Sequence, residues 1–167
     1  MASFGERIVG AAKLRSATYE DVEHDTRAMS QALTVVVMSS IATAIGSGVR
    51  VGVGDIFRGT IIALISWLIW AGLTYFIGTK ILGTRTTHAT WGQLLRTTGF
   101  ATSPGLLRIV GVVPFTTGLV FFATSIWMLM AFVVGVQQAL DYRNVWRAVG
   151  VCLIGWIVYV TFGIFVY

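Results

Sequence analysis

The residues best suited to chemistry lie close together near the N-terminus, in the stretch TYEDVEHDTR, residues 18–27. On a helix Glu20 and His24 stand four residues apart, and so do Asp21 and Asp25, so each pair shares one face. Carboxylate and imidazole groups at this spacing can hold a divalent cation. The simpler interpretation, which we favour, is the solvated start of a helix whose acidic residues pair with nearby arginines.

Signatures of catalysis are missing from the sequence. It contains no HExxH zinc motif, no GxSxG nucleophile elbow and no glycine-rich loop that would cradle a phosphate. The single cysteine, Cys152, lies in an apolar stretch, where the reactive thiolate is disfavoured. His24 and His88 lack partners at a catalytic spacing. We therefore expect a protein without enzymatic activity, bound metal or cofactor.

One arginine, Arg108, falls in a stretch apolar enough to enter a membrane, residues 97–113 (TTGFATSPGLLRIVGVV). A charged side chain at the centre of a bilayer costs roughly 2.5–3.5 kcal/mol, so such a residue suggests a function. Arg108 is a candidate for binding a lipid phosphate or an acidic group of a partner. The alternative is a structural arginine that snorkels, or donates to backbone carbonyls freed by Pro104. Pro104, Gly99 and Arg96 complete this candidate site, and Glu20, Asp21 and Asp25 are the next candidates for binding a lipid or a partner.

The elements that must position these residues follow from the composition. Of 167 residues, 56% are hydrophobic and only 11% are charged, and the mean hydropathy is +0.80. The 12 basic and 7 acidic residues are too few to cover a soluble globule, because an average soluble domain is about 25% charged. The composition excludes a soluble enzyme domain and a disordered chain, and it predicts an all-α, polytopic membrane bundle.

Charged residues divide the chain into predicted spans. A spanning helix needs about 20 apolar residues, and three charge-free stretches have that length. In the longer gap after Arg108, turn signals at Gly111, Pro114 and Gly118 separate a fourth span from a broken third one. The sequence therefore predicts five spans at about 28–49, 59–79, 97–117, 119–138 and 148–167. A re-entrant hairpin is the alternative for the third.

Basic residues indicate how the chain is oriented. With five spans and a cytoplasmic N-terminus, nine lysines and arginines lie on the inner side and two, Arg50 and Arg58, on the outer side. With four spans the division is eight to four, so the excess of positive charge on the inner side favours five. We expect residues 1–27 to form a cytoplasmic segment and residues 28–167 to form the membrane domain.

The cytoplasmic segment is expected to begin with a short amphipathic helix. Within residues 4–15, Phe4, Ile8 and Ala11 lie near one helical face, which Arg7 and other basic residues flank. Such a helix can lie on an anionic inner leaflet with its basic side chains reaching the headgroups. A frayed terminus is the alternative.

Two threonines have the spacing of helix-capping residues. Thr18 is followed three residues later by Asp21, and Thr90 by Gln93, which resembles the capping box that opens many helices. The second cap would begin a helix whose apolar side chains dip into the membrane interface while Arg96 meets the lipid headgroups.

Small residues dominate the stretch SSIATAIGSG, residues 39–48. Ala42 and Gly46 have small-xxx-small spacing, and so do Ala44 and Gly48, which allows helices to approach closely. Packing inside one bundle is the simpler interpretation, and dimerisation is the alternative.

Several sequence pieces occur in an order typical of one family. FGERIVGAAKL (residues 4–14) and TYEDVEHD (18–25) precede QALTVVV, which opens the first span. The strongest piece is GFATSPGLLRIVG, Gly99–Gly111, a glycine–aromatic–small–x–x–proline element. With these pieces the chain resembles bacterial members of the Yip (Ypt-interacting protein) domain family of small five-span membrane proteins, over about residues 4–167.

The resemblance implies fold and topology more than chemistry. Eukaryotic relatives bind prenylated Rab GTPases through an aspartate–leucine–tyrosine–glycine–proline motif in a longer N-terminal region. This chain lacks the motif, and its nearest piece, Tyr19-Glu20-Asp21, does not match, so Rab binding is not implied. The short N-terminal region and the resemblance favour the inner (plasma) membrane of a bacterium.

These observations predict a non-enzymatic integral membrane protein that organises membrane components, as a scaffold, an accessory subunit or a lipid-associated shaping protein. The expected partners are the lipid bilayer and either further copies of the chain or other membrane-protein subunits, with no nucleic acid. The alternative is a small transporter or channel built on the broken third span, since discontinuous helices can line binding sites.

Overall fold

The structure is a computed structural model that describes residues 2–48, 52–84, 87 and 89–166. All regular elements in these ranges are helices, which confirms the all-α prediction. In chain order they are α1 (Phe4–Ala12), α2 (Ser16–His24), α3 (Ala28–Gly46), α4 (Val53–Phe76), η1 (Ile77–Ile81), α5 (Trp91–Phe100), η2 (Ser103–Val112), α6 (Thr117–Ala139) and α7 (Val145–Val166). Predictions that fall on His88, Arg50 and the span ends at 49 and 167 lie outside the described residues.

Three helices of the described ranges are long and apolar enough to cross a membrane, which makes this chain a multi-pass membrane protein. They are Ala28–Gly46, Val53–Ile81 and Thr117–Ala139. α7 adds a shorter apolar helix over Val145–Val158. These helices match four of the predicted spans, and the total of five spans stays a prediction.

The second long helix begins earlier than the predicted span 59–79. α4 starts at Val53, so Asp55 and Arg58 belong to the helix instead of preceding it. The Asp55 carboxylate accepts a hydrogen bond from the Gly52 N–H at 3.0 Å, at the end where the helix dipole favours negative charge. A charge can therefore open a helix whose later turns are apolar, so the charge-free gap is shorter than the helix.

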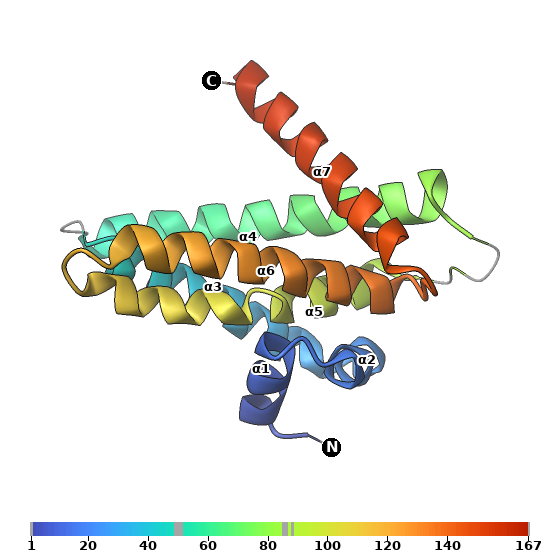
Figure 1. The fold of residues 1–167 in the computed structure, drawn as a ribbon, viewed down its shortest axis with the longest axis horizontal. Helices are drawn as coiled ribbons and strands as arrows, with labels where there is room; N and C mark the ends of the chain where they lie inside the picture. Colours follow the sequence, from blue (N-terminus) through green and yellow to red (C-terminus); the bar gives the residue numbers. More distant parts are fainter. Residues whose placement is uncertain (1, 49–51, 85–86, 88, 167) are drawn as a thin grey trace.

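The third predicted span is broken and consists of two helices in series. α5 ends at Phe100, and the 3-10 helix η2 continues from Ser103 with Pro104 in its first turn, where a missing N–H costs nothing. At 1.5 Å per residue in α5 and 2.0 Å in η2, the pair extends about 35 Å, enough for a hydrocarbon core of about 30 Å. Figure 1 shows both running along the bundle beside α6.

The packing of α3 against η2 depends on small residues. A Cβ added at Gly46 would clash with the Arg108 carbonyl oxygen, and one added at Gly105 would clash with Ser39 Oγ. Ala42 is buried on the same helix, so Ala42 and Gly46 both face the interior of the bundle in this structure. Ala44 lines a cavity described below, and Gly48 follows the end of α3 with φ +70°.

A π-helix, η1, extends α4 at the end where α6 turns into α7. A π-helix leaves carbonyl groups without their usual helical donors. The Tyr142 hydroxyl lies 2.7 Å from the Gly78 carbonyl oxygen and 3.0 Å from that of Leu82, so it supplies a donor there. From this junction α7 crosses the bundle obliquely, and its C-terminal end lies away from the other helices (Figure 1).

Candidate functional site

The structure places four of the predicted site residues in two regions of the molecule. One is a polar network that holds α1 and α2 against the bundle, and it contains Asp21, Asp25 and Arg96. The other is a cavity between helices of the bundle that is open on one side, the bundle cavity, which Arg108 lines.

Arg7 is the centre of the polar network, with only 2% of its side chain exposed. Its Nε and Nη2 atoms lie 2.8 Å from the carboxylates of Asp21 and Asp25, and Nη1 donates to Gln31 at 2.9 Å. This guanidinium lowers the pKa of the Asp25 carboxyl below its usual value. The two aspartates thus pair with a nearby arginine, the interpretation favoured from the sequence, while Glu20 stays exposed.

Two expectations for this region are wrong. α1 forms as predicted, but Arg7 is buried against α2 and does not reach toward lipid headgroups, because acidic partners on α2 neutralise it. Thr18 caps no helix, since α2 already begins at Ser16 and its N-cap residue Arg15 makes no side-chain capping bond. Thr18 instead packs against Gly10 of α1, where a Cβ would clash with it.

Arg96 fastens the C-terminal end of α2 to α5. Its Nε donates to the Val22 carbonyl at 2.9 Å, and its Nη2 donates to the Glu23 carbonyl. The last carbonyls of a helix lack helical donors and carry the negative end of the helix dipole, so a guanidinium suits them. Arg96 is 7% exposed, and the expectation that it meets lipid headgroups is therefore wrong.

Glu23 and Gln93 form the second link between α2 and α5. Gln93 Nε2 donates to Glu23 Oε1 at 2.9 Å, and the same Gln93 forms the predicted capping box with Thr90. Glu23 is 3% exposed, and this burial raises the pKa of its carboxyl to about 7.

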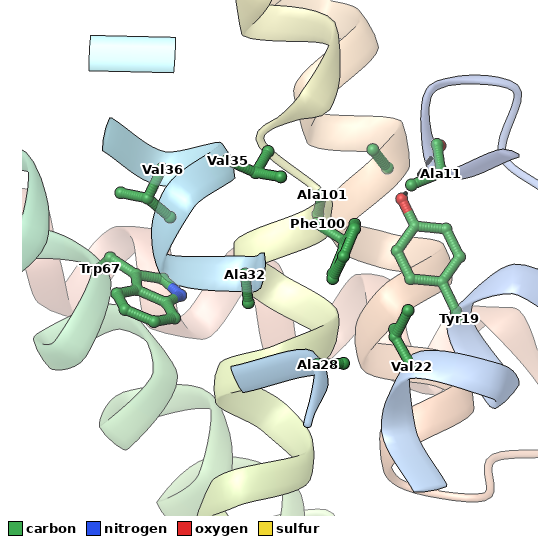
Figure 2. Close-up of a cluster of buried hydrophobic side chains, with 11 residues drawn as sticks. Ala11, Tyr19, Val22, Ala28, Ala32, Val35, Val36, Trp67, Phe100 and Ala101 are labelled. Atoms are coloured by element: carbon green, nitrogen blue, oxygen red, sulfur yellow. Dashed lines mark hydrogen bonds between the residues drawn. The ribbon is translucent and has the colours of Figure 1, made fainter. Parts of the chain in front are cut away.

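Aromatic side chains complete the attachment of α1 and α2. The Tyr19 hydroxyl donates to the Ala11 carbonyl at 3.1 Å, and Trp127 Nε1 donates to the Ala12 carbonyl at 2.7 Å. Figure 2 shows Phe100 lying between Ala32 of α3 and the ring of Tyr19. The N-terminal helices therefore share one apolar core with α3 and α5, although the sequence predicts a boundary after residue 27.

The bundle cavity has a volume of about 490 Å³, within the range of small-molecule sites. Helices α3, α4, η2 and α6 all contribute to its wall. The lining residues are Val36, Ser39, Ser40, Thr43, Ala44, Gly59, Ala63, Ser66, Trp67, Trp70, Thr102, Arg108, Met128 and Phe132.

Arg108 bridges α3 and α6 at the wall of this cavity. Its Nε donates to Thr124 Oγ1 at 3.2 Å, Nη1 to Thr43 Oγ1 at 3.4 Å, and Nη2 to Ser125 Oγ at 2.9 Å. The guanidinium carbon also lies 5.1 Å from the centre of the Phe121 ring, at cation–π distance. These hydrogen bonds go to hydroxyl groups, unlike the backbone carbonyls that the structural alternative invoked.

Comparison with protein families decides which group of proteins this chain resembles. The profile of the Yip1 domain matches residues 14–167, which is almost the whole chain. The chain belongs to the Yip1 domain family. Neither the curated proteins nor the solved structures that were searched contain a match. The Yip1 domain of this chain covers α2 to α7, so it includes Arg96 and the whole bundle cavity, while Arg7 precedes it.

Other predicted site residues of the Yip1 domain serve packing. A Cβ at Gly99 would press on Ala32 and Trp67, so this glycine lets α5 approach α3 and α4. Pro104 is buried at the start of η2 and does not line the cavity.

Sequence analysis missed the hydroxyl-bearing wall of the cavity. Ser39, Ser40 and Thr43 belong to one face of α3 together with Val36. The spacing 36, 39, 40, 43 is helical, and a stripe of hydroxyl residues on an otherwise apolar helix is a signal that the sequence already contains. The aromatic wall of Trp67 and Trp70 carries no such signal, because tryptophans in a membrane helix are ordinarily packing residues.

Proposed function

We propose that this Yip1-family membrane protein is a non-enzymatic organiser of other membrane components, acting as a scaffold or accessory subunit. We further propose five spans, a cytoplasmic N-terminus and location in a bacterial inner (plasma) membrane. One observation carries the proposal: the polar network fixes the helix pair α1–α2 in a single position on the membrane bundle.

A fixed polar helix pair supports an organising role because it presents a defined surface to other proteins. Buried polar networks with satisfied partners specify geometry more than they add stability. On α2 and the following turn, Ala17, Glu20, Asp21, His24 and Asp25 line a shallow surface groove. Arg7 pairs with Asp21 and Asp25, so the exposed Glu20 is the acidic side chain that this groove offers to a basic segment of a partner subunit.

Site-specific photo-crosslinking in native membranes tests this role. A photo-crosslinking amino acid at position 20 replaces the exposed Glu20, and a control is placed at Phe122, which is 67% exposed on α6. We expect position 20 to capture a stoichiometric partner subunit or a second copy, and position 122 to capture mainly lipid. The Arg96→Ala variant should lose the first product, since it releases α2. Recovery of only a dispersed, uncrosslinked monomer would contradict the proposal.

The proposed topology has its own test. A cysteine at Ser16 and a cysteine appended after residue 167 are labelled with a membrane-impermeant maleimide, while the buried Cys152 gives little background. Five spans place these two cysteines on opposite sides, with Ser16→Cys labelled only after the membrane is opened. Labelling of both from the same side would indicate an even number of spans.

The bundle cavity suggests a second function that can be tested, that of a small transporter or channel. The cavity is lined by Arg108 of the broken segment, and discontinuous helices can line transport sites. Reconstituted liposomes would then show a solute flux that Arg108→Ala reduces. Flux that this substitution leaves unchanged would exclude a pathway through the cavity.

A further inference from the structure

We propose that the bundle cavity binds an anionic amphiphile from the membrane. Its phosphate or carboxylate group contacts Arg108, and its hydrocarbon chain lies against Trp67, Trp70 and Phe132. This inference does not depend on the organising role, because the cavity and the polar network share no residue.

The charge of Arg108 calls for an anion. The seven acidic residues of the chain are Glu6, Glu20, Asp21, Glu23, Asp25, Asp55 and Asp141, and among the described residues none of them forms an ion pair with Arg108. Asp55 lies in the first turn of α4, where its carboxylate accepts a hydrogen bond from the Gly52 N–H. The three hydroxyls that Arg108 contacts accept hydrogen bonds but do not neutralise its charge. Arg7, by contrast, has two carboxylates.

The guanidinium also has donors to offer a ligand. It carries five N–H groups, and three of them serve the hydroxyls of Thr43, Thr124 and Ser125 among the described residues. The two that remain sit on Nη1 and Nη2, the pair of atoms that binds phosphate or carboxylate in a two-pronged manner. Because Arg108 lines the cavity, an anion there can complete its coordination.

The charged side chain of the cavity lining lies near one end, and the aromatic side chains lie further along the cavity. The end that contains Arg108 is the one where α3 stops and α6 starts. Its partners Thr43 and Thr124 show this, since at 1.5 Å per residue Thr43 lies about 5 Å from the end of α3 and Thr124 about 10 Å from the start of α6. Further from that end the wall contains Val36 of α3, Trp70 of α4 and Phe132 of α6. The aromatic residues are therefore set apart from Arg108 along the cavity, and Ser66 and Thr102 also line this further part.

The dimensions fit a chain-like ligand better than a compact anion. On α4 the lining extends from Gly59 to Trp70, about 16 Å along the helix at 1.5 Å per residue. Gly59 and Ala63 leave the space open along this wall, and Trp70 packs edge-to-face with Phe132 at 6.0 Å between ring centres. A phosphate alone would leave this apolar part unfilled, whereas an acyl chain would bury apolar surface against it.

Native mass spectrometry of the purified full chain tests the site. After delipidation, the protein is titrated in separate arms with phosphatidylglycerol, phosphatidylcholine, a long-chain fatty acid and inorganic phosphate. We expect one strongly bound molecule of phosphatidylglycerol or fatty acid per chain, and at least tenfold weaker binding of phosphatidylcholine and of phosphate. Saturable phosphate binding as tight as that of the amphiphiles would overturn the role of the hydrocarbon chain.

Variants separate the two ends of the cavity. Arg108→Gln should weaken binding of the anionic amphiphiles about tenfold or more, corresponding to the loss of one charge-assisted contact. Arg108→Lys should retain part of the binding. Arg58→Gln, which removes an exposed charge of α4 outside the cavity lining, should bind like the parent chain.

The apolar end is tested by filling it while Arg108 is kept. Ala63→Phe should exclude the chain-bearing ligands and leave weak phosphate binding unchanged. This variant also decides the question if Arg108→Gln fails to fold, which thermal unfolding in detergent would reveal. Unaltered amphiphile binding in either folded variant would refute the site.

Discussion

Arg96 and Arg108 lie on the two sides of the same helix break, Arg96 in α5 and Arg108 in η2, and their surroundings differ. Arg96 is buried against the C-terminal carbonyls of α2, where the helix dipole supplies negative potential. Arg108 lies among hydroxyl groups at a cavity wall, and among the described residues no carboxylate forms an ion pair with it. Both arginines have hydrogen-bond partners, but of the two only Arg96 faces the negative end of a helix dipole, and for this reason we propose a structural role for Arg96 and a ligand for Arg108.

The largest expected effect separates the two arginines by stability. Arg96→Ala should cost about 3 kcal/mol, because two charge-assisted hydrogen bonds are lost and two buried carbonyls stay without donors. Arg108→Gln should change stability by less than about 1 kcal/mol, since the lost hydroxyl contacts are offset by removing a charge from an apolar environment. Unfolding in mixed detergent micelles measures both, and equal losses would remove the distinction.

A second comparison concerns the backbone that positions Arg108. Gly46→Val should destabilise the fold by about 2 kcal/mol, because its side chain would clash with the Arg108 carbonyl and push η2 away from α3. Gly54→Ala, at a site of α4 with open space around it, is the matched control and should unfold like the parent chain. A tolerated Gly46→Val would mean that the contact between α3 and η2 is looser than the structure indicates.

A smaller loss of stability is expected when the capping box of α5, the helix that contains Arg96, is removed. Thr90→Ala should cost about 1 kcal/mol, because the Gln93 N–H loses its side-chain acceptor at the helix start. Thr26→Ala, an exposed threonine near the end of α2, serves as the control and should have no measurable effect. Hydrogen exchange at the first turn of α5 measures the change, and equal protection in both variants would contradict the capping role.

The smallest expected effect is a pH dependence of the stability of the fold, which comes from the polar network. Burial is the main reason why the pKa of Glu23 is about 7 in the folded chain, above its ordinary value of 4.5. Between pH 4.5 and pH 7 the Glu23 carboxyl is therefore protonated in the folded state and ionised in the unfolded state. Its contribution to stability is complete below pH 4.5 and is lost as the pH rises through 7. The expected change in stability is about 1 kcal/mol.

Thermal unfolding at pH 5.5 and pH 8.5 measures this dependence. The parent chain should have the higher Tm at pH 5.5, by about 3 °C. Glu23→Gln should reduce the difference by removing the group that titrates, while the neighbouring His24 still contributes in the same direction. An undiminished pH dependence in Glu23→Gln would show that another group is responsible.

Much of the fold could be predicted from local patterns. The long apolar helices, the break at Pro104 and the Thr90–Gln93 cap each depend on residues close in sequence. The errors concern contacts across the sequence: Arg7 and Arg96 look like headgroup-binding residues until α2 supplies their acceptors. The cavity was not predicted because four separate helices form it. Of its lining residues, only Arg108 is unusual in its own segment of the sequence.

The sequence by itself determined that this chain is an all-helical membrane protein of the Yip1 domain family with a broken segment near Pro104, because composition, apolar length and motif order are properties of the linear chain. Only the tertiary structure decided which arginine is neutralised. Val22 and Glu23 reach Arg96 across more than seventy positions, and Thr43 reaches Arg108 across 65. Such acceptors are brought into place by helix packing, which no local pattern encodes.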